Sequence, residues 1–238
     1  MNLTYATIMA AAILSGATIS RFTQSDLRIA KRDKFLIGLA AFCGSMIAAR
    51  LPFGLQELWA MPNAGFAFGS GKTIMCGLVG GYFGVEVAKK YLRITVKTGD
   101  SFAVPVAVAV GIGRLACFAG GCCFGTPTNS TWGVVFPHID QLRRHPTQIY
   151  EAIFHLTMAM ILWTLFRANA LRGQLIKLYF LTYFGYRFIT EFIRPEARIL
   201  FGLTGYQWAA VILTPLFIWL WIMDAGRLKH PATVVEPG

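Results

Sequence analysis

The residues best suited to chemistry lie in the stretch from Gly113 to Gly125, where an arginine is followed by small residues and three cysteines. Arg114 ends an apolar run that begins at Phe102. A charge in such a run is costly unless it is paired or used, and a cysteine thiolate is a strong nucleophile. The stretch predicts a site for an anion or for thiol chemistry, and the plainer alternative is an arginine that snorkels to a membrane surface. The three cysteines are Cys117, Cys122 and Cys123.

A second group of charges lies further along the chain, inside another apolar run. Arg187, Glu191 and Arg194 follow one another at spacings of four and three, which places them on one face of a helix. Ionisable groups inside a span usually line a polar cavity or a substrate path. The alternative is an internal ion pair between Arg187 and Glu191 that only locks the helices together. We expect Arg114 and Glu151 to meet this group near the outer leaflet.

The composition is that of a membrane protein. The chain has 238 residues, of which 55% are hydrophobic and 14% are charged, and its mean hydropathy is +0.55. We therefore predict an all-α, polytopic fold with residues 1–238 in a single transmembrane domain. The net charge of +11 comes from short basic blocks between apolar runs, and no nucleic-acid motif is present, so the expected partner is the membrane and not nucleic acid. The first apolar run has no charged leader and is interpreted as a retained span.

About seven transmembrane helices are predicted from the lengths of the apolar runs. The third run is short and rich in glycine, which favours close helix packing. The segment 52–70 contains Pro52 and Pro62, and we expect it to lie along the outer surface instead of crossing. The predicted spans are Leu3–Ser20, Phe35–Phe53, Thr73–Ala88, Phe102–Gly120, Gln148–Phe166, Leu175–Ile193 and Tyr206–Met223.

The connecting segments predict the orientation. Those on one side carry thirteen Lys and Arg residues, in 21–34, 89–97, at Arg167 and Arg172, and in the carboxyl-terminal tail. Those on the other side carry six, namely Arg50, Lys72, Arg143, Arg144, Arg194 and Arg198. The positive-inside rule then places the amino terminus outside and the carboxyl terminus in the cytoplasm, with the loop 126–146 outside.

Four motifs, in order and at matching spacing, resemble the prolipoprotein diacylglyceryl transferase family. They are GRLACFAGGCCFG, RHPTQIYE, YRFITEFIRPE and GYQWAAVILTP, and the second is the most specific. The resemblance implies a seven-helix enzyme of the bacterial inner membrane, with a periplasmic amino terminus. It also implies transfer of a diacylglyceryl group from phosphatidylglycerol to the cysteine thiol of a prolipoprotein, with release of glycerol phosphate.

The resemblance also implies site residues. Arg114, Arg187, Glu191 and Arg194 fall on charged positions of the family, where the arginines would hold the phosphate of the donor lipid. A planar guanidinium presents two donors to a phosphate, whereas lysine supplies a point charge. The candidate catalytic residues are Arg114, Arg187, Cys122, His145 and Glu191, and the candidate substrate-binding residues are Arg114, Arg187, Arg194, Tyr150 and Glu151.

The chain departs from the family on the side of the acceptor. Two asparagines and an acid that follow the family's arginine are replaced by Cys117, Gly120 and Cys122, and Met75 stands where a histidine is expected. Three hypotheses stay open. The chain carries out the family reaction with another base, such as His145 or a carboxylate; it uses the same or a similar phospholipid with another acceptor, through Cys122 or Cys123 as nucleophile; or it binds or transports lipid without chemistry.

The remaining cysteine interpretations are structural. The three clustered cysteines, with His138 and His145, lack the C-x-x-C spacing of zinc sites, so neither a metal nor a cofactor is expected. A disulfide from Cys117 to Cys122 or Cys123 is compatible with an oxidising compartment. Cys43 and Cys76 lie in apolar runs and are interpreted as packing residues.

The charge asymmetry gives a testable topology. A reporter fused after Gly238 should give a cytoplasmic signal, and one inserted at Asn129 an external signal, because basic segments stay inside. An internal signal at Asn129 would contradict the assignment of the active site to the outer face.

Overall fold

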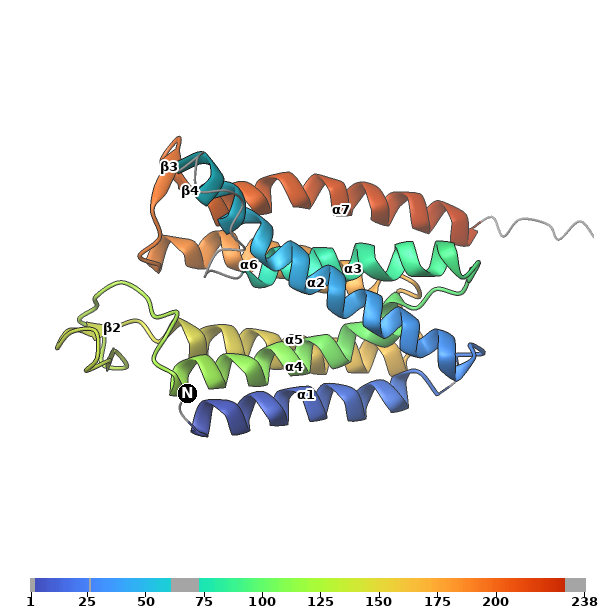
Figure 1. Ribbon diagram of the computed structural model, residues 1–238, viewed down its shortest axis with the longest axis horizontal. Helices are drawn as coiled ribbons and strands as arrows, with labels where there is room; N and C mark the ends of the chain where they lie inside the picture. Colours follow the sequence, from blue (N-terminus) through green and yellow to red (C-terminus); the bar gives the residue numbers. More distant parts are fainter. Residues whose placement is uncertain (1–2, 26, 61–72, 230–238) are drawn as a thin grey trace, which may run out of the picture. The chain divides into compact units, whose positions relative to one another are not determined.

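The computed structural model describes residues 3–25, 27–60 and 73–229, most of which are helical (Figure 1). The all-α prediction is confirmed. The helices are α1 (Leu3–Thr23), α2 (Lys31–Ala60), α3 (Ile74–Tyr91), α4 (Gly99–Ala119), α5 (Thr147–Arg167), α6 (Leu175–Thr190), the 3-10 helix η2 (Glu191–Ile193) and α7 (Gly205–Lys229).

Two short antiparallel hairpins interrupt the helices. In the first, β1 (Val134–Val135) pairs with β2 (Arg143–Arg144) in the connection between α4 and α5. In the second, β3 (Arg198–Leu200) pairs with β4 (Leu203–Thr204) between η2 and α7. The first hairpin follows the carboxyl-terminal end of α4, and the second follows the carboxyl-terminal end of α6 and η2. Both hairpins belong to the loops next to the candidate site.

In the described part of the chain, five helices are long and apolar enough to cross a bilayer, namely α1, α2, α4, α5 and α7. Several of their large side chains, among them Ile13, Ile153 and Ile212, are exposed, as lipid-facing residues would be. The protein is a multi-pass membrane protein. The shorter helices α3 and α6 do not meet the same criteria, so the count of about seven spans stays a prediction.

One predicted boundary is wrong. Pro52 does not end the second helix, since α2 continues to Ala60. A proline removes one helical hydrogen bond, and membrane helices tolerate that loss. Pro62 and the rest of the predicted surface segment up to residue 72 lie outside the described residues. In the sixth span, α6 ends at Thr190, and Arg194 already has an extended backbone.

The chain forms two compact units. One consists of Met1–Ser25 with Thr98–Gly238, and the other of Asp26–Lys97. The first unit contains α1, α4 to α7 and both hairpins, and it therefore contains every candidate site residue. Met75, which stands where the family has a histidine, lies in the second unit. The second unit contains α2 and α3. One transmembrane domain for the whole chain stays a prediction.

In the first unit, α4 contacts α1, α5 and α6, and α6 packs against α7 (Figure 1). Polar contacts lock the helix ends opposite to Arg114. Asp100, at the start of α4, accepts hydrogen bonds from the amides of Gly173 and Leu175, the latter at 3.0 Å. Lys177 lies 2.6 Å from Asp224 near the end of α7. These contacts fix the axial register of α4, α6 and α7.

In the second unit, α2 and α3 pack through glycines. A Cβ atom added to Gly80 would overlap the carbonyl oxygen of Gly44 and the side chain of Ala48, so the two backbones approach too closely for any larger residue. Thr73 caps α3 by accepting a hydrogen bond from the amide of Cys76 at 3.0 Å. Cys43 is exposed and Cys76 is half-buried. Cys43 was expected to be a packing residue, but it lies on a helix face that is open within its unit.

This packing predicts the effect of one added methyl group. Gly80→Ala should destabilise the protein by about 1–3 kcal/mol, because the new Cβ atom meets fixed backbone. Gly38→Ala is the matched control in α2, since nothing lies within 4 Å of its added Cβ atom. Thermal unfolding of the full chain in detergent micelles measures both. Equal stability of Gly80→Ala and Gly38→Ala would contradict the close approach.

Candidate active site

Arg114 and Glu151 form a buried ion pair between the end of α4 and the start of α5. Their exposed fractions are 6% and 1%. Tyr183, on α6, donates a hydrogen bond of 2.7 Å to Glu151 Oε1. Three helices therefore meet at one carboxylate.

A histidine follows this carboxylate by one helical turn on α5. His155 is fully buried, and its Nε2 atom lies 3.8 Å from Glu151 Oε1. Its Nδ1 atom lies 2.8 Å from the hydroxyl of Tyr179. Glu151, His155, Tyr179 and Tyr183 thus form a polar column between α5 and α6. The column continues from Glu151 along α5, and Arg114 lies at the Glu151 end of the column.

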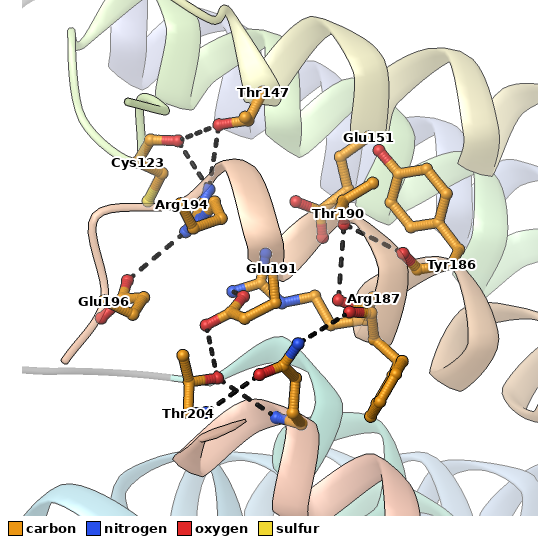
Figure 2. Close-up of polar contacts among 12 residues, drawn as sticks. Cys123, Thr147, Glu151, Tyr186, Arg187, Thr190, Glu191, Arg194, Glu196 and Thr204 are labelled. Carbon is orange, nitrogen blue, oxygen red and sulfur yellow. Dashed lines mark hydrogen bonds and ion pairs between the residues drawn. The ribbon is translucent and has the colours of Figure 1, made fainter. Parts of the chain in front are cut away.

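The second ion pair joins Arg187 to Glu191, with a distance of 2.9 Å between nitrogen and oxygen (Figure 2). Thr204 donates a hydrogen bond of 3.0 Å to Glu191 Oε1. The guanidinium of Arg187 lies over the ring of Tyr206, 4.5 Å from its centre. Although Glu191 follows the end of α6 in η2, the short 3-10 turn keeps it next to Arg187. The pair predicted from the spacing of four is present.

Arg194 does not share a helical face with this pair, contrary to the prediction, because α6 has ended before it. Its side chain turns instead toward Thr147 at the start of α5 and toward Cys123 in the segment after α4, as Figure 2 shows. Its guanidinium donates to the carbonyl of Cys123 at 2.7 Å and to Thr147 Oγ1 at 3.1 Å. On the opposite side it lies 3.8 Å from a carboxylate oxygen of Glu196. Arg194 therefore joins the segment after α6 to the cysteine segment.

His145 and Tyr150 lie together at the start of α5. His145 Nδ1 is 3.2 Å from the hydroxyl of Tyr150, and both residues are half-buried. The carbonyl of His145 accepts a hydrogen bond of 2.8 Å from the amide of Gly125. The histidine is thus held next to the end of the cysteine segment.

The loop before α5 is braced by its own charges. Arg144 pairs with Asp140, and its guanidinium lies over the ring of Phe124, 5.1 Å from the centre. The hydrogen bond from Arg144 lowers the pKa of Asp140 below its ordinary value. This pair holds the loop against the aromatic residue that follows the three cysteines.

The three cysteines come together after α4 ends. Their sulfur atoms all lie within 4.8 Å of one another. The chain reverses there through Gly121 and Cys123, whose φ angles are +65° and +60°. A left-handed backbone is uncommon for cysteine and persists only where the surroundings hold it. Hydrogen bonds from Cys117 and Cys122, with the charges of Arg114 and Arg194, lower the pKa of the Cys123 thiol.

The site offers free hydrogen-bond donors to an anion. Among the described residues, the Nε atoms of Arg114 and Arg194 are buried and meet no hydrogen-bond acceptor. A buried donor that is left unpaired costs about 1–3 kcal/mol, which a bound ligand with acceptor oxygens would recover. Because both donors belong to guanidinium groups, a phosphate or carboxylate fits them best.

Comparisons with known proteins identify the family of this chain. The sequence model of the family described as prolipoprotein diacylglyceryl transferase matches residues 3–223. The chain belongs to the prolipoprotein diacylglyceryl transferase family.

Relatives in the prolipoprotein diacylglyceryl transferase family come from several bacteria. A phosphatidylglycerol--prolipoprotein diacylglyceryl transferase of Methylobacillus flagellatus is 32% identical over 158 residues, which are 62% of this chain and 60% of that protein. The second enzyme of this name in Clostridium perfringens is 31% identical over 68% of this chain and 62% of that protein. One from Legionella pneumophila strain Paris is 28% identical over 79% and 76%. The matches to the first two relatives span about three fifths of their length. The family and the apolar helices indicate a multi-pass protein of the inner membrane.

The structure also brings to the candidate site four residues that were not predicted from the sequence. Tyr183 precedes Arg187 by four residues, so the helical spacing could have indicated it. Gln148 and Thr147 lie inside the RHPTQIYE motif, and both bond to carbonyls of the cysteine segment. Thr204 carries no sequence signal, because only the β3–β4 hairpin brings it to Glu191.

Loss of the Glu151 charge should destabilise this transferase-family protein strongly. Glu151→Gln leaves the buried Arg114 without its counter-charge, and we expect a cost of about 3–5 kcal/mol. The control is Glu196→Gln, whose side chain is 37% exposed in its pair with Arg194; its cost should stay below about 1 kcal/mol. Thermal unfolding in micelles compares the two. Similar small losses in both variants would show that the Arg114–Glu151 pair is not a structural constraint.

Proposed function

We propose that this protein transfers the diacylglyceryl group of phosphatidylglycerol to the cysteine thiol of a prolipoprotein. In this reaction the thiol sulfur forms a bond to the glycerol carbon that carries the phosphate. The bond from that carbon to the phosphate oxygen breaks, and glycerol phosphate leaves with the electron pair. The thiol proton passes to a base or to water, so the products are a thioether lipid on the peptide and glycerol phosphate.

The observation that carries this proposal is the set of buried arginines at one end of the first unit. Arg114, Arg187 and Arg194 are all buried, and Arg114 and Arg194 each keep an unpaired Nε donor. Negative charge grows on the phosphate as the carbon–oxygen bond breaks. Fixed guanidinium groups away from water stabilise that charge most effectively. The carboxylates of Glu151 and Glu191 keep the arginines oriented, and they limit the net positive charge.

An apolar groove supports the binding of a lipid tail by the same unit. The groove has a volume of about 480 Å³ and is lined by residues of α1, α4 and α5, among them Val104, Val108 and Leu156. Val108 precedes Arg114 by six residues, which is about 9 Å along a helix. An acyl chain in the groove would place its glycerol ester end toward Arg114.

His145 is the proposed base for the acceptor thiol. It follows β2, its ring lies beside Tyr150, and its backbone pairs with Gly125, two residues after Cys123. An imidazole nitrogen within reach of a thiol can act as a general base. Tyr150 would orient the ring through the contact at Nδ1 and leave Nε2 as the other basic atom.

The proposed orientation places this chemistry at the periplasmic face. The excess of basic residues in the connections 21–34 and 89–97 supports it. The contacts of Asp100 and Lys177 would then lie on the cytoplasmic side, with the arginines at the opposite end of the same helices. The amino terminus would be periplasmic and the carboxyl terminus cytoplasmic.

Conservative replacement of two arginines tests the proposal. Arg114→Lys and Arg187→Lys should each lower kcat/KM for transfer to a lipobox peptide by about a hundredfold or more, because an ammonium cannot reproduce the paired donors. Arg198→Lys is the control, since Arg198 is exposed and lies outside the ion pairs. The assay uses purified protein in micelles with phosphatidylglycerol, and thermal unfolding verifies that each variant is folded. Wild-type turnover in both site variants would contradict phosphate binding by these arginines.

A further inference from the structure

We propose that Cys117, Cys122 and Cys123 bind one zinc ion and leave its fourth coordination position open for a thiol. The first cysteine lies in the last turn of α4, and the other two are consecutive residues after the reversal of the chain. The expectation that no metal binds came from the absence of C-x-x-C spacing along the sequence. The fold supplies the proximity that this spacing would otherwise provide.

The distances suit a zinc ion. The three sulfur atoms lie within 4.8 Å of one another. Zinc–sulfur bonds of about 2.3 Å in a tetrahedral site separate the sulfurs by about 3.8 Å. In the part of the chain that the structure describes, this is the one cluster of three or more His, Cys, Asp or Glu side chains with such ligand geometry.

The backbone of the cluster is held in place by side chains from other elements. Gln148 donates to the carbonyl of Cys122. Arg194 and Thr147 each donate to the carbonyl of Cys123 at 2.7 Å. These contacts maintain the unusual left-handed conformation of Cys123, which directs its thiol toward the other two. Preorganised ligands of this kind are typical of metal sites.

Among the described residues, no histidine belongs to this cluster of ligand atoms, which leaves a fourth position open. His138 Nε2 lies 3.0 Å from the carbonyl oxygen of Gly121. His145 Nδ1 lies beside the hydroxyl of Tyr150. Structural zinc sites close with four protein ligands, whereas catalytic sites use three and keep the fourth position for water or substrate. Three cysteines therefore point to a catalytic type of site.

The surrounding charges favour this complex. Three thiolates and a zinc ion carry a net charge of −1, and the cationic side chain of Arg194 lies beside the cluster, where it donates a hydrogen bond of 2.7 Å to the carbonyl of Cys123. Cys122 and Cys123 are exposed, so an ion and a peptide thiol can both reach the cluster. The site is thus electrostatically matched and accessible.

The role of the open position rests on the proposed function. A thiol that binds zinc is deprotonated at neutral pH. The acceptor thiol would give its proton to His145 or water on binding, and it would attack the glycerol carbon as a thiolate. Its sulfur forms the carbon–sulfur bond, the phosphate oxygen takes the electron pair of the broken bond, and zinc keeps its oxidation state throughout. The arginines that hold the phosphate belong to the same end of the unit.

The metal content of the purified full-length protein tests the site. We expect about one zinc per chain by elemental mass spectrometry, held against a weak chelator. Cys117→Ser, Cys122→Ser and Cys123→Ser should each lose it, and Cys43→Ser should retain it. Thermal unfolding of each variant separates loss of the site from loss of the fold. Zinc in the wild-type protein no higher than in a folded triple serine variant would overturn the proposal.

Cobalt substitution tests the open position. The cobalt-loaded protein should show a thiolate-to-cobalt charge-transfer band in the near ultraviolet. A lipobox peptide should change its visible bands, and the same peptide with serine in place of cysteine should not. An unchanged spectrum with the cysteine peptide would overturn the open position.

Transfer activity distinguishes this inference from the proposed function. A spectral response to the peptide without any lipid transfer would support the zinc site and refute the proposed function. Full transfer by folded, zinc-free Cys122→Ser or Cys123→Ser would refute the role of zinc and leave the proposed function standing. A diacylglyceryl adduct on Cys122 or Cys123 in the intact mass would also overturn the inference, since it would make that thiol the nucleophile.

Discussion

Arg114 and Glu151 carry opposite charges at a place where neither is accessible to water, and the surrounding structure is arranged to satisfy both. The carboxylate receives Tyr183 from α6. An uncompensated charge there would cost several kcal/mol, so α4, α5 and α6 must meet in one register. The polar contacts at the far ends of α4, α6 and α7 fix the same register. The ion pair is therefore a structural constraint, and its arginine is part of the proposed anion-binding site.

The segment after α4 depends on the same arrangement. Side chains of α5 and Arg194 hold the carbonyls of Cys122 and Cys123, which makes the thiols converge. Arg194 also keeps an unpaired donor for a phosphate. One guanidinium thus connects the proposed donor site to the proposed metal site. In this account, lipid phosphate and acceptor thiol bind to neighbouring parts of a single polar end of the first unit.

Hydropathy and charge spacing along the sequence predicted the helical fold and one of the two buried ion pairs of the site. Each predicted apolar run corresponds to a helix, although α2 and α7 extend several residues beyond the predicted ends, and the spacing of four gave the Arg187–Glu191 pair. Pro52 was misleading because a membrane helix tolerates the hydrogen bond that proline removes. The position of Arg194 was missed because helical periodicity says nothing about where a helix ends. The sequence left a disulfide from Cys117 to Cys122 or Cys123 open, but it did not show that all three thiols converge, because that requires left-handed backbone at Gly121 and Cys123 and contacts from residues of α5.

In the proposed reaction, the bond between the glycerol carbon and the phosphate oxygen is the one that breaks. The most direct measurement quantifies both products when the purified protein acts on phosphatidylglycerol and a lipobox peptide. We expect glycerol phosphate and diacylglyceryl peptide in equal molar amounts. Free glycerol with a phosphate-containing lipid on the peptide, or the absence of any modified peptide, would contradict it.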